Sequence, residues 1–153
     1  MEELAPYMIV EHEVVIRRPI AEVFAYLEDQ RNATAWREGV VSVERLSPGA
    51  ALRGATFREV AKTPMGQGSA TYEVTEVVPN ERIEFEVTAG PLRPHGVLRL
   101  RATDDGAGTR LAYRVDTKAR GFAALMEKGF AKFLNDMIVK SAENVKSRLE
   151  GIG

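Results

Sequence analysis

Five side chains in this sequence could move a proton or orient an oxygen atom of a ligand: His12, Glu59, Tyr72, His95 and Tyr113. Histidine suits acid–base work because its ordinary pKa is about 6.5. A carboxyl group surrounded by apolar walls can serve as an acid or a base near neutral pH, because desolvation raises its pKa. A buried tyrosine hydroxyl needs a hydrogen-bond partner, and a ligand can supply one.

The two histidines stand in different contexts. His12 belongs to a predicted strand, where alternation points it the same way as Val14 and Ile16. It is either a polar group of the interior or a strand-end histidine bonded to a neighbour. His95 lies in the loop segment LRPHG, where it either orients a ligand carbonyl or acts as a general base, or is an ordinary surface residue. Two separate histidines without an HxH or HExxH spacing predict no metal site.

The other three candidates lie on predicted strands. Glu59 is in phase with Phe57 and Ala61, so it either points inward or lies at an exposed edge. Tyr72 and Tyr113 fall on the predicted inward faces of separate strands. Core packing and ligand binding explain the two tyrosines equally well, so the residues alone assign no catalytic group.

The composition excludes several classes of protein. The chain has 153 residues, of which 44% are hydrophobic and 28% charged, as in ordinary globular proteins. Its 21 basic and 22 acidic residues leave no positive excess for binding nucleic acid. The absence of cysteine excludes disulfides and thiolate chemistry. No G-x-S-x-G segment is present to predict a serine hydrolase, and we expect no cofactor.

The sequence also predicts where the protein resides. No apolar run approaches the ~20 residues of a membrane span. The first segment, MEELAPYMIVEHE, is acidic and lacks both the basic region and the cleavable apolar stretch of a signal peptide. We therefore expect a cytoplasmic protein with no integral membrane association. Monomer and homodimer both remain open.

The sequence predicts a single α+β domain over residues 9–150 that positions these candidate side chains. An N-terminal lead-in of residues 1–8 precedes the domain. Polar and apolar residues alternate strictly in segments such as RIEFEVTA, which predicts antiparallel strands with one dry face. Pro19 suits the first turn of a helix. The expected strands span 9–17, 40–47, 55–63, 69–78, 82–89, 97–103 and 109–119. The expected helices span 19–28 and 121 to about 150. A second short helix or turns follow residue 28.

The terminal helix carries an unusually broad apolar stripe. Its first part, GFAALMEKGFAKFLNDMIVK, is rich in phenylalanine and methionine, and the whole helix reaches about 45 Å at ~1.5 Å per residue. It is the one predicted element long enough to cover the dry face of the sheet. Methionine adapts to walls of irregular shape. The stripe therefore predicts a helix that covers the sheet without filling all of the space beneath it.

Four segments carry a resemblance to a known family: RRPIAEVFAYLEDQRNATAW, GATFREV, TYEVTEVVPNERIEFEV and GTRLAYRVD. Together they resemble the START-like, or SRPBCC, superfamily over roughly residues 9–150, and within it the polyketide cyclase/dehydrase and lipid-transport branch. The resemblance implies a helix-grip fold, in which a curved seven-stranded antiparallel sheet wraps a long C-terminal helix and two short helices follow the first strand. These motifs are structural, so they identify the fold better than the activity.

The same resemblance implies a ligand cavity between the sheet and the terminal helix. The residues expected to line it are Phe57, Tyr72, Val74, Phe85, Leu98, Leu100, Tyr113, Phe122, Leu125, Met126, Phe130, Phe133 and Met137.

Three functions fit this cavity. The first is binding, with possible transport, of a small hydrophobic molecule such as a lipid, polyketide or isoprenoid. The second is a metal-free cyclase or dehydratase acting on a polyketide-like or aromatic carbonyl compound. That enzyme would bring at least two of the five candidate side chains together. The third is a regulatory protein-interaction module, which would show a filled interior and an exposed apolar patch.

Overall fold

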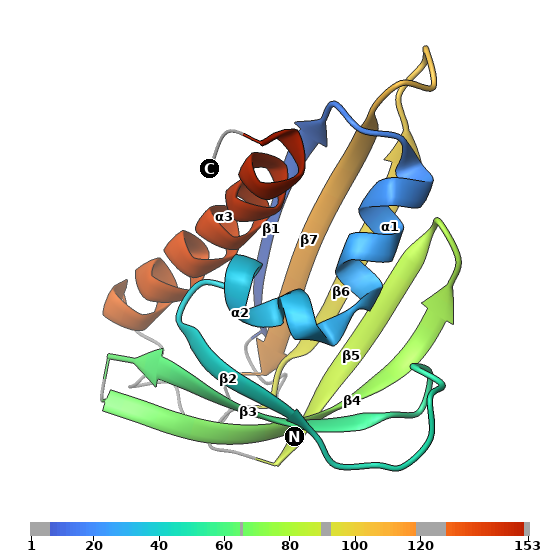
Figure 1. The fold of residues 1–153 in the computed structure, drawn as a ribbon. Coiled ribbons are helices and arrows are strands. Elements are labelled where there is room, and N and C mark those ends of the chain that lie inside the picture. The colour runs from blue at the N-terminus through green and yellow to red at the C-terminus, as the bar shows by residue number, and fades with distance from the viewer. Residues whose placement is uncertain (1–6, 65, 90–92, 119–127, 152–153) are drawn as a thin grey trace, which may run out of the picture.

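A computed structural model describes residues 7–64, 66–89, 93–118 and 128–151 of the chain. The described residues form the predicted arrangement of one strand, short helices, six further strands and a long C-terminal helix (Figure 1). The elements are β1 (Tyr7–Ile16), α1 (Ile20–Glu28), the 3-10 turn η1 (Gln30–Asn32), α2 (Ala33–Trp36), β2 (Val40–Arg45), β3 (Thr56–Thr63), β4 (Gly66–Val78), β5 (Arg82–Ala89), β6 (His95–Ala102), β7 (Thr109–Lys118) and α3 (Lys128–Glu150).

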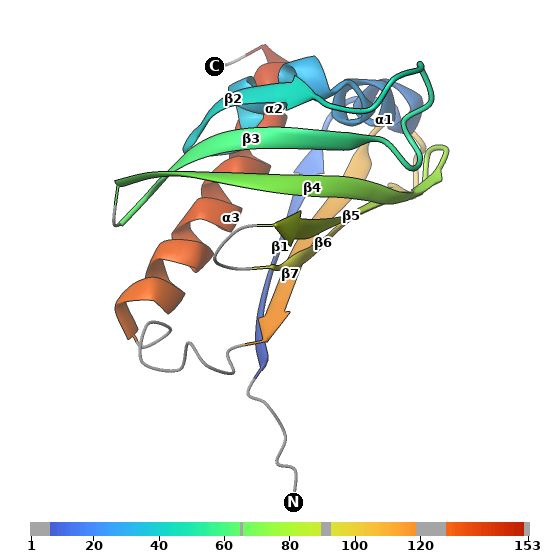
Figure 2. The ribbon, with the colours of Figure 1, turned by 90° about the horizontal axis from the view of Figure 1, so that it is seen from below.

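The seven strands make one antiparallel sheet in the order β1-β7-β6-β5-β4-β3-β2. The sheet is strongly curved, so that β2, β3 and β4 run across the direction of β1 and β7 (Figure 2). Register shifts in the β2–β3 and β4–β5 pairs contribute to this bend, because an extra residue in one strand increases the local twist. The long helix α3 packs against β1 and β7 on the concave side.

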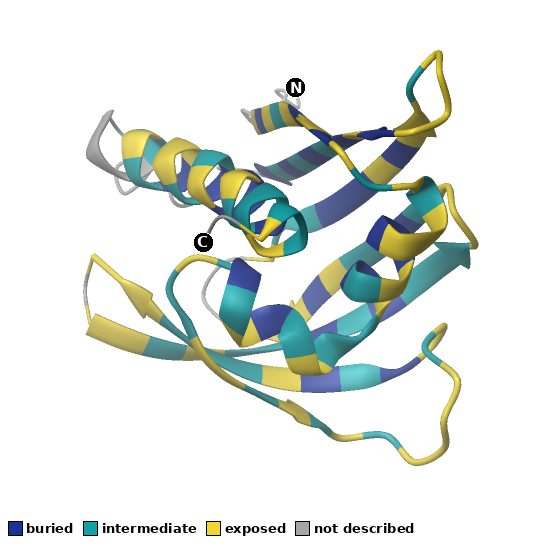
Figure 3. Cartoon of the chain, turned by 45° about the horizontal axis from the view of Figure 1, so that its top comes forward, coloured by how far each residue is buried: buried dark blue, intermediate teal, exposed yellow. Residues whose placement is uncertain are grey.

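The core lies between the concave face and the helices (Figure 3). Along α3, Ile138, Ala142 and Val145 are fully buried, and their spacing places them on one face of the helix. Ile16 and Leu111 are fully buried on the facing strands. Burial of this apolar stripe, worth roughly 25 cal/mol per Å² of apolar area removed from water, holds α3 in the bend of the sheet.

Three strands begin earlier than the sequence predicts. β1 starts at Tyr7 rather than residue 9, because Tyr7 pairs with Lys118 of β7. β4 starts at Gly66 rather than residue 69, because pairing of Gly66 with Thr63 continues the β3–β4 ladder to the end of the hairpin. β6 starts at His95 rather than residue 97, because His95 pairs with Glu86 on one side and Asp116 on the other. The expected start of the last helix, at residue 121, lies outside the described residues. No helix in the described part of the chain is long and apolar enough to cross a membrane.

A glycine in β6 makes room for an aromatic ring of the interior. Gly96 is the cross-strand partner of Phe85, and its backbone is buried. A Cβ atom at residue 96 would overlap the ring of Phe85. Gly96 therefore lets Phe85 lie flat against the sheet, where the ring is tilted against Tyr72 at a centroid distance of 5.9 Å.

We predict that Gly96→Ala lowers the free energy of unfolding by about 2 kcal/mol, because the ring of Phe85 must move within a packed core. Gly68→Ala in β4 is the matched control. Its Cβ would meet Cγ2 of Thr63 at 3.8 Å, an ordinary contact, so stability should stay the same or rise by up to about 1 kcal/mol. Urea unfolding of the two variants checks this difference, and equal stabilities would contradict it.

Candidate functional site

A buried ion pair between Arg37 and Glu59 lies at the centre of the candidate site. Nη1 of Arg37 is 2.6 Å from Oε1 of Glu59, and the two side chains are only 15% and 12% exposed. Glu59 lies on β3 in phase with the buried Phe57, so strand alternation turns its carboxylate inward. Arg37 directly follows α2 and reaches toward β3 from the helix side.

Hydrogen bonds from α3 fix the backbone on both sides of Arg37. The side chain of Asn144 donates to the carbonyl of Trp36 at 3.2 Å. The backbone N–H of Glu38 donates to the hydroxyl of Ser141 at 2.8 Å, and Ser141 is 2% exposed. Because both anchors lie on the rigid terminal helix, the guanidinium group of Arg37 is held in one place relative to the sheet.

Aromatic rings surround the guanidinium group. Its carbon lies 5.5 Å from the ring centroid of Tyr72 and 5.7 Å from that of Phe85, within the range of cation–π attraction. Tyr72 stacks on Phe57 at 5.3 Å, and Trp36 meets Tyr113 edge-on at 5.7 Å. The hydroxyl groups of Tyr72 and Tyr113 both interact with Arg37 as hydrogen-bond partners.

Arg37 and the two tyrosines keep fixed protonation states near neutral pH. Burial is the largest single influence on the pKa of Arg37 and works to lower it, but the charge and hydrogen bond of Glu59 together with the two tyrosines outweigh burial, so the pKa is raised and the cation is stable. Burial raises the pKa of Tyr72 to about 12 and also raises the pKa of Tyr113. Both phenols therefore stay protonated at neutral pH. The Tyr72 hydroxyl donates to Oε1 of Gln30 at 2.7 Å.

One space borders the ion pair, and another lies beside α3. A small enclosed space of about 10 Å³ is bounded by Gln30, Trp36, Arg37, Tyr72, Val74, Ile83, Phe85 and Leu98, and it has room for about one water-sized atom. An open groove of about 420 Å³ runs between the start of β2, the end of β3 and α3, and it is lined by Glu38, Gly39, Lys62, Thr63, Pro64, Phe133, Asp136, Met137 and Lys140.

A second open groove lies on the other side of Gln30. It measures about 550 Å³ and runs between the end of α1 and the loop after β2. Gln30 borders both this groove and the small enclosed space. Phe57 also lines the groove while stacking on Tyr72.

Three of the five candidate side chains come together in this structure. Glu59, Tyr72 and Tyr113 all interact with Arg37. His12 lies on the same face of the sheet as its cross-strand partner Tyr113, but its ring contacts Glu143 of α3 at 3.3 Å.

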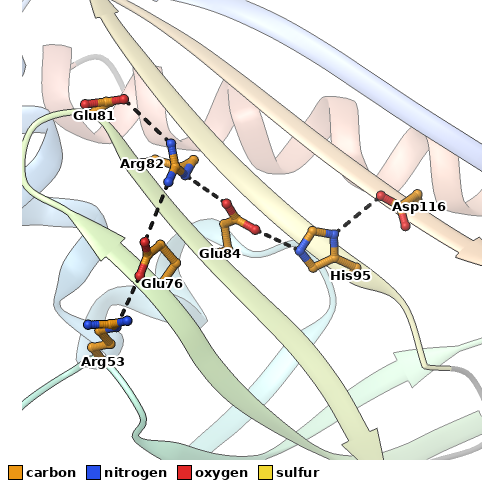
Figure 4. A network of polar contacts seen from close by, with 7 residues as sticks. All are labelled: Arg53, Glu76, Glu81, Arg82, Glu84, His95 and Asp116. Carbon is orange, nitrogen blue, oxygen red and sulfur yellow. Dashed lines mark hydrogen bonds and ion pairs between the residues drawn. The ribbon is translucent and has the colours of Figure 1, made fainter.

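His95 belongs to a different network, on the face of the sheet that points away from α3 (Figure 4). Its Nε2 lies 3.0 Å from Glu84 and its Nδ1 3.5 Å from Asp116. Arg82 extends the network from Glu84 to Glu76 and Glu81. The expected loop position of His95 is therefore wrong, because the residue is part of β6, and its side chain points outward as in the reading of a surface residue.

The expected cavity residues are distributed among these spaces. Tyr72, Val74, Phe85 and Leu98 surround the small enclosed space, and Phe133 and Met137 line the groove beside α3. Phe57 borders the second groove, while Leu100 and Tyr113 are buried in the core. Phe122, Leu125 and Met126 lie outside the described residues, and the side chain of Phe130 is likewise not described.

Arg37 and Gln30 are residues of the candidate site that sequence reasoning missed. Gln30 begins the short turn η1 and Arg37 lies between α2 and β2, where no periodicity indicates a direction for the side chain. The available signal is the neighbouring Trp36, the one tryptophan of the chain, which is 3% exposed. No group of three metal-ligating side chains occurs in the residues that the structure describes.

Comparison with known proteins gives a family and a fold. The family profile described as polyketide cyclase / dehydrase and lipid transport matches residues 8–150. No curated protein matches the sequence.

Solved structures share the fold at low sequence identity. A Thermus thermophilus protein has a TM-score of 0.79 and 20% identity, covering 94% of this chain and 97% of that chain. A START superfamily protein from Mycobacterium smegmatis has a TM-score of 0.75 and 14% identity, with coverages of 95% and 99%. The Zhui aromatase/cyclase from a Streptomyces species has a TM-score of 0.73 and 18% identity, with coverages of 97% and 99%. The helix-grip architecture expected from the sequence is therefore confirmed.

We predict that Arg37→Met lowers the free energy of unfolding by about 3 kcal/mol, because it leaves the carboxylate of Glu59 buried without its cation. Arg58→Met is the matched control on the same strand as Glu59. Arg58 is 52% exposed and its partner Glu44 is 64% exposed, so the change should cost less than about 1 kcal/mol. Urea unfolding measures both variants, and similar losses would show that the interior pair is not special.

The raised pKa of Tyr72 predicts a loss of stability in alkali. Below its ordinary pKa of 10.0 the phenol is neutral in both states. As the pH rises from there toward about 12, the unfolded chain releases the proton more easily than the folded protein, so stability falls. Tyr72→Phe removes this contribution. Wild type should lose about 1 kcal/mol more than the variant between pH 9 and pH 11, as measured by urea unfolding. Parallel losses would contradict the assignment.

Proposed function

Because the chain belongs to the polyketide cyclase/dehydrase and lipid-transport family, we propose that it binds a small hydrophobic ligand, such as a lipid, polyketide or isoprenoid, between the sheet and α3. The observation that carries the proposal is the groove of about 420 Å³ between the start of β2, the end of β3 and α3. Its volume lies in the range of about 300–1,000 Å³ that is usual for ligand pockets.

The groove leads toward the ion pair along two elements. Glu38 and Gly39, which line it, directly follow Arg37 in the chain. On β3, Thr63 lines the groove and lies on the same face of the strand as Glu59, four residues away. A ligand that extends from the groove along β3, over the roughly 13 Å from Thr63 to Glu59, would bring one end to the guanidinium group.

The lining suits an amphipathic guest. Phe133, Met137 and Pro64 supply apolar contact, and each Å² of apolar surface they cover contributes roughly 25 cal/mol. Met137 is flexible and can fit guests of different shape. Lys62 and Lys140 at the groove are balanced in charge by the acids Glu38 and Asp136.

The convergence of Glu59, Tyr72 and Tyr113 on Arg37 supports a cyclase or dehydratase as the second candidate function. In that role the groove holds a carbonyl compound in a folded conformation, which removes much of the entropic barrier to ring closure. Arg37 and the protonated tyrosines stabilise the negative charge that develops on an enolate oxygen. Glu59 accepts the proton. Incubation of the bound ligand followed by mass spectrometry separates the two functions, because a dehydratase releases one water and a carrier returns the ligand unchanged.

An interaction module finds less support in the described residues. Their exposed large apolar side chains are Ile9 and Val15 on β1 and Val41 and Leu46 at β2. β1 and β2 are the two opposite edges of the sheet, so these four residues form no common patch.

We predict that the neutral fluorophore N-phenyl-1-naphthylamine binds the wild-type protein and that Met137→Trp weakens its binding at least tenfold, about 1.4 kcal/mol, by filling the groove. Leu46→Trp is the control, because Leu46 is 47% exposed and lies away from this groove. Fluorescence titration measures the dissociation constants. Native mass spectrometry of freshly purified protein identifies any ligand that is already bound. Absence of probe binding and of any bound molecule would contradict the proposal.

A further inference from the structure

The Arg37–Glu59 ion pair, whose arginine borders the small enclosed space, has no net charge. We propose that Glu59 makes the site select hydrophobic molecules whose polar end is a neutral hydroxyl or carbonyl oxygen, and reject those that end in a carboxylate. This inference rests on the proposed function, since it assigns a ligand class to the same site. It separates a polyketide-like or phenolic guest from a free fatty acid.

A buried arginine without a partner would give the opposite preference. Guanidinium groups bind carboxylates through two parallel hydrogen bonds, so such a site recruits acids. Here a carboxylate is already bound: Nη1 of Arg37 lies 2.6 Å from Glu59, and both side chains are largely buried. A ligand carboxylate would place a second negative charge next to one cation. The repulsion between the two carboxylates offsets the attraction of the ligand carboxylate to that cation.

The other groups of the cluster supply hydrogen bonds without charge. Tyr72 and Tyr113 reach Arg37 through their hydroxyl groups, and Tyr72 donates to Gln30 at 2.7 Å. Both hydroxyls are neutral polar groups in a largely aromatic surrounding. The hydrogen of Tyr72 is already donated to Gln30, so Tyr72 can accept a hydrogen bond from a ligand hydroxyl, and Tyr113 can share one with a ligand oxygen.

The space next to Arg37 also fits a single oxygen atom. It measures about 10 Å³ and is bounded by Arg37, Tyr72, Phe85 and five further side chains. One hydroxyl or carbonyl oxygen occupies about the volume of a water molecule and fills such a space. A carboxylate has two oxygens and brings tightly bound water, for which this space has no room.

Three naphthalene probes test the preference on the wild-type protein at pH 7: neutral 2-naphthol, neutral methyl 2-naphthoate and anionic 2-naphthoate. Trp36 is the one tryptophan of the chain, is 3% exposed and borders the small space, so its fluorescence reports occupancy. We expect both neutral probes to bind at least tenfold more tightly than 2-naphthoate.

A carboxylate loses more hydration on burial than its methyl ester does, so part of the preference for the ester arises without Glu59. Variants of Glu59 measure the part that this residue causes. In Glu59→Gln the cation of Arg37 is unpaired, so the affinity for 2-naphthoate should rise about tenfold while that for methyl 2-naphthoate changes little. Glu44→Gln is the control: it breaks the exposed pair with Arg58 on the neighbouring strands and should change neither affinity. If Glu59→Gln does not fold, Glu59→Asp, which keeps the charge but withdraws it from Arg37, should raise the affinity for 2-naphthoate by a smaller factor.

The outcomes distinguish this inference from the proposed function. Equal affinity of wild type for 2-naphthoate and its methyl ester overturns the charge selectivity and leaves ligand binding intact. An unchanged preference in the folded Glu59 variants overturns the role of Glu59. Failure of all three probes to bind overturns the proposed function, and the selectivity with it.

Discussion

A guanidinium group inside a protein needs a negative partner, and the interior of this molecule is organised around one such pair. Arg37 and Glu59 come from opposite layers, the short helices and the sheet, and they meet at 2.6 Å. Each charge makes the other tolerable in a place where either alone would be strongly destabilising. The hydrogen bonds from Ser141 and Asn144 place the two residues that flank Arg37 and thereby connect the pair to α3.

The fold explains why a polar group can stand in such a place. The sheet bends around α3, and the apolar side chains of Ile138, Ala142 and Val145 fill the contact on one side of the concave face. On the other side of the concave face, toward β3 and β4, aromatic rings and the Arg37–Glu59 pair lie where apolar side chains of α3 do not reach. An open groove lies between the start of β2, the end of β3 and α3. The arrangement combines an apolar surface with one fixed polar point, which is the general form of a site for small amphipathic molecules.

The elements of the fold were largely predictable because alternation is a strong signal in this chain. Ile83 and Val87 are buried as the pattern of β5 indicates, and Glu59 points inward as its phase with Phe57 allowed. The same rule could have placed His95: Leu98 and Leu100 point inward, so residue 95 on an extended strand must point outward, where it meets Glu84 and Asp116. Two prolines and a glycine surround His95, and these residues favour a loop over a strand.

The inward position of the Arg37 side chain could not be predicted from strand alternation. It stands between α2 and β2, where neither a helical nor a strand period applies, and a long side chain there can reach solvent or the interior. Only the three-dimensional placement of α2 on α3 decides its direction. The site was therefore half predictable: the pattern placed Tyr72 and Tyr113 inward, it left Glu59 open between the interior and an exposed edge, and it did not indicate Arg37.

The most direct test of the account is an NMR titration with 2-naphthol, using protein labelled at methionine methyl groups and arginine side chains. If the groove and the ion pair form one ligand site, intermolecular nuclear Overhauser effects should connect the naphthalene ring to the methyl group of Met137, and the side-chain N–H resonances of Arg37 should shift as the site fills. Saturable binding that leaves both residues unperturbed would contradict the account.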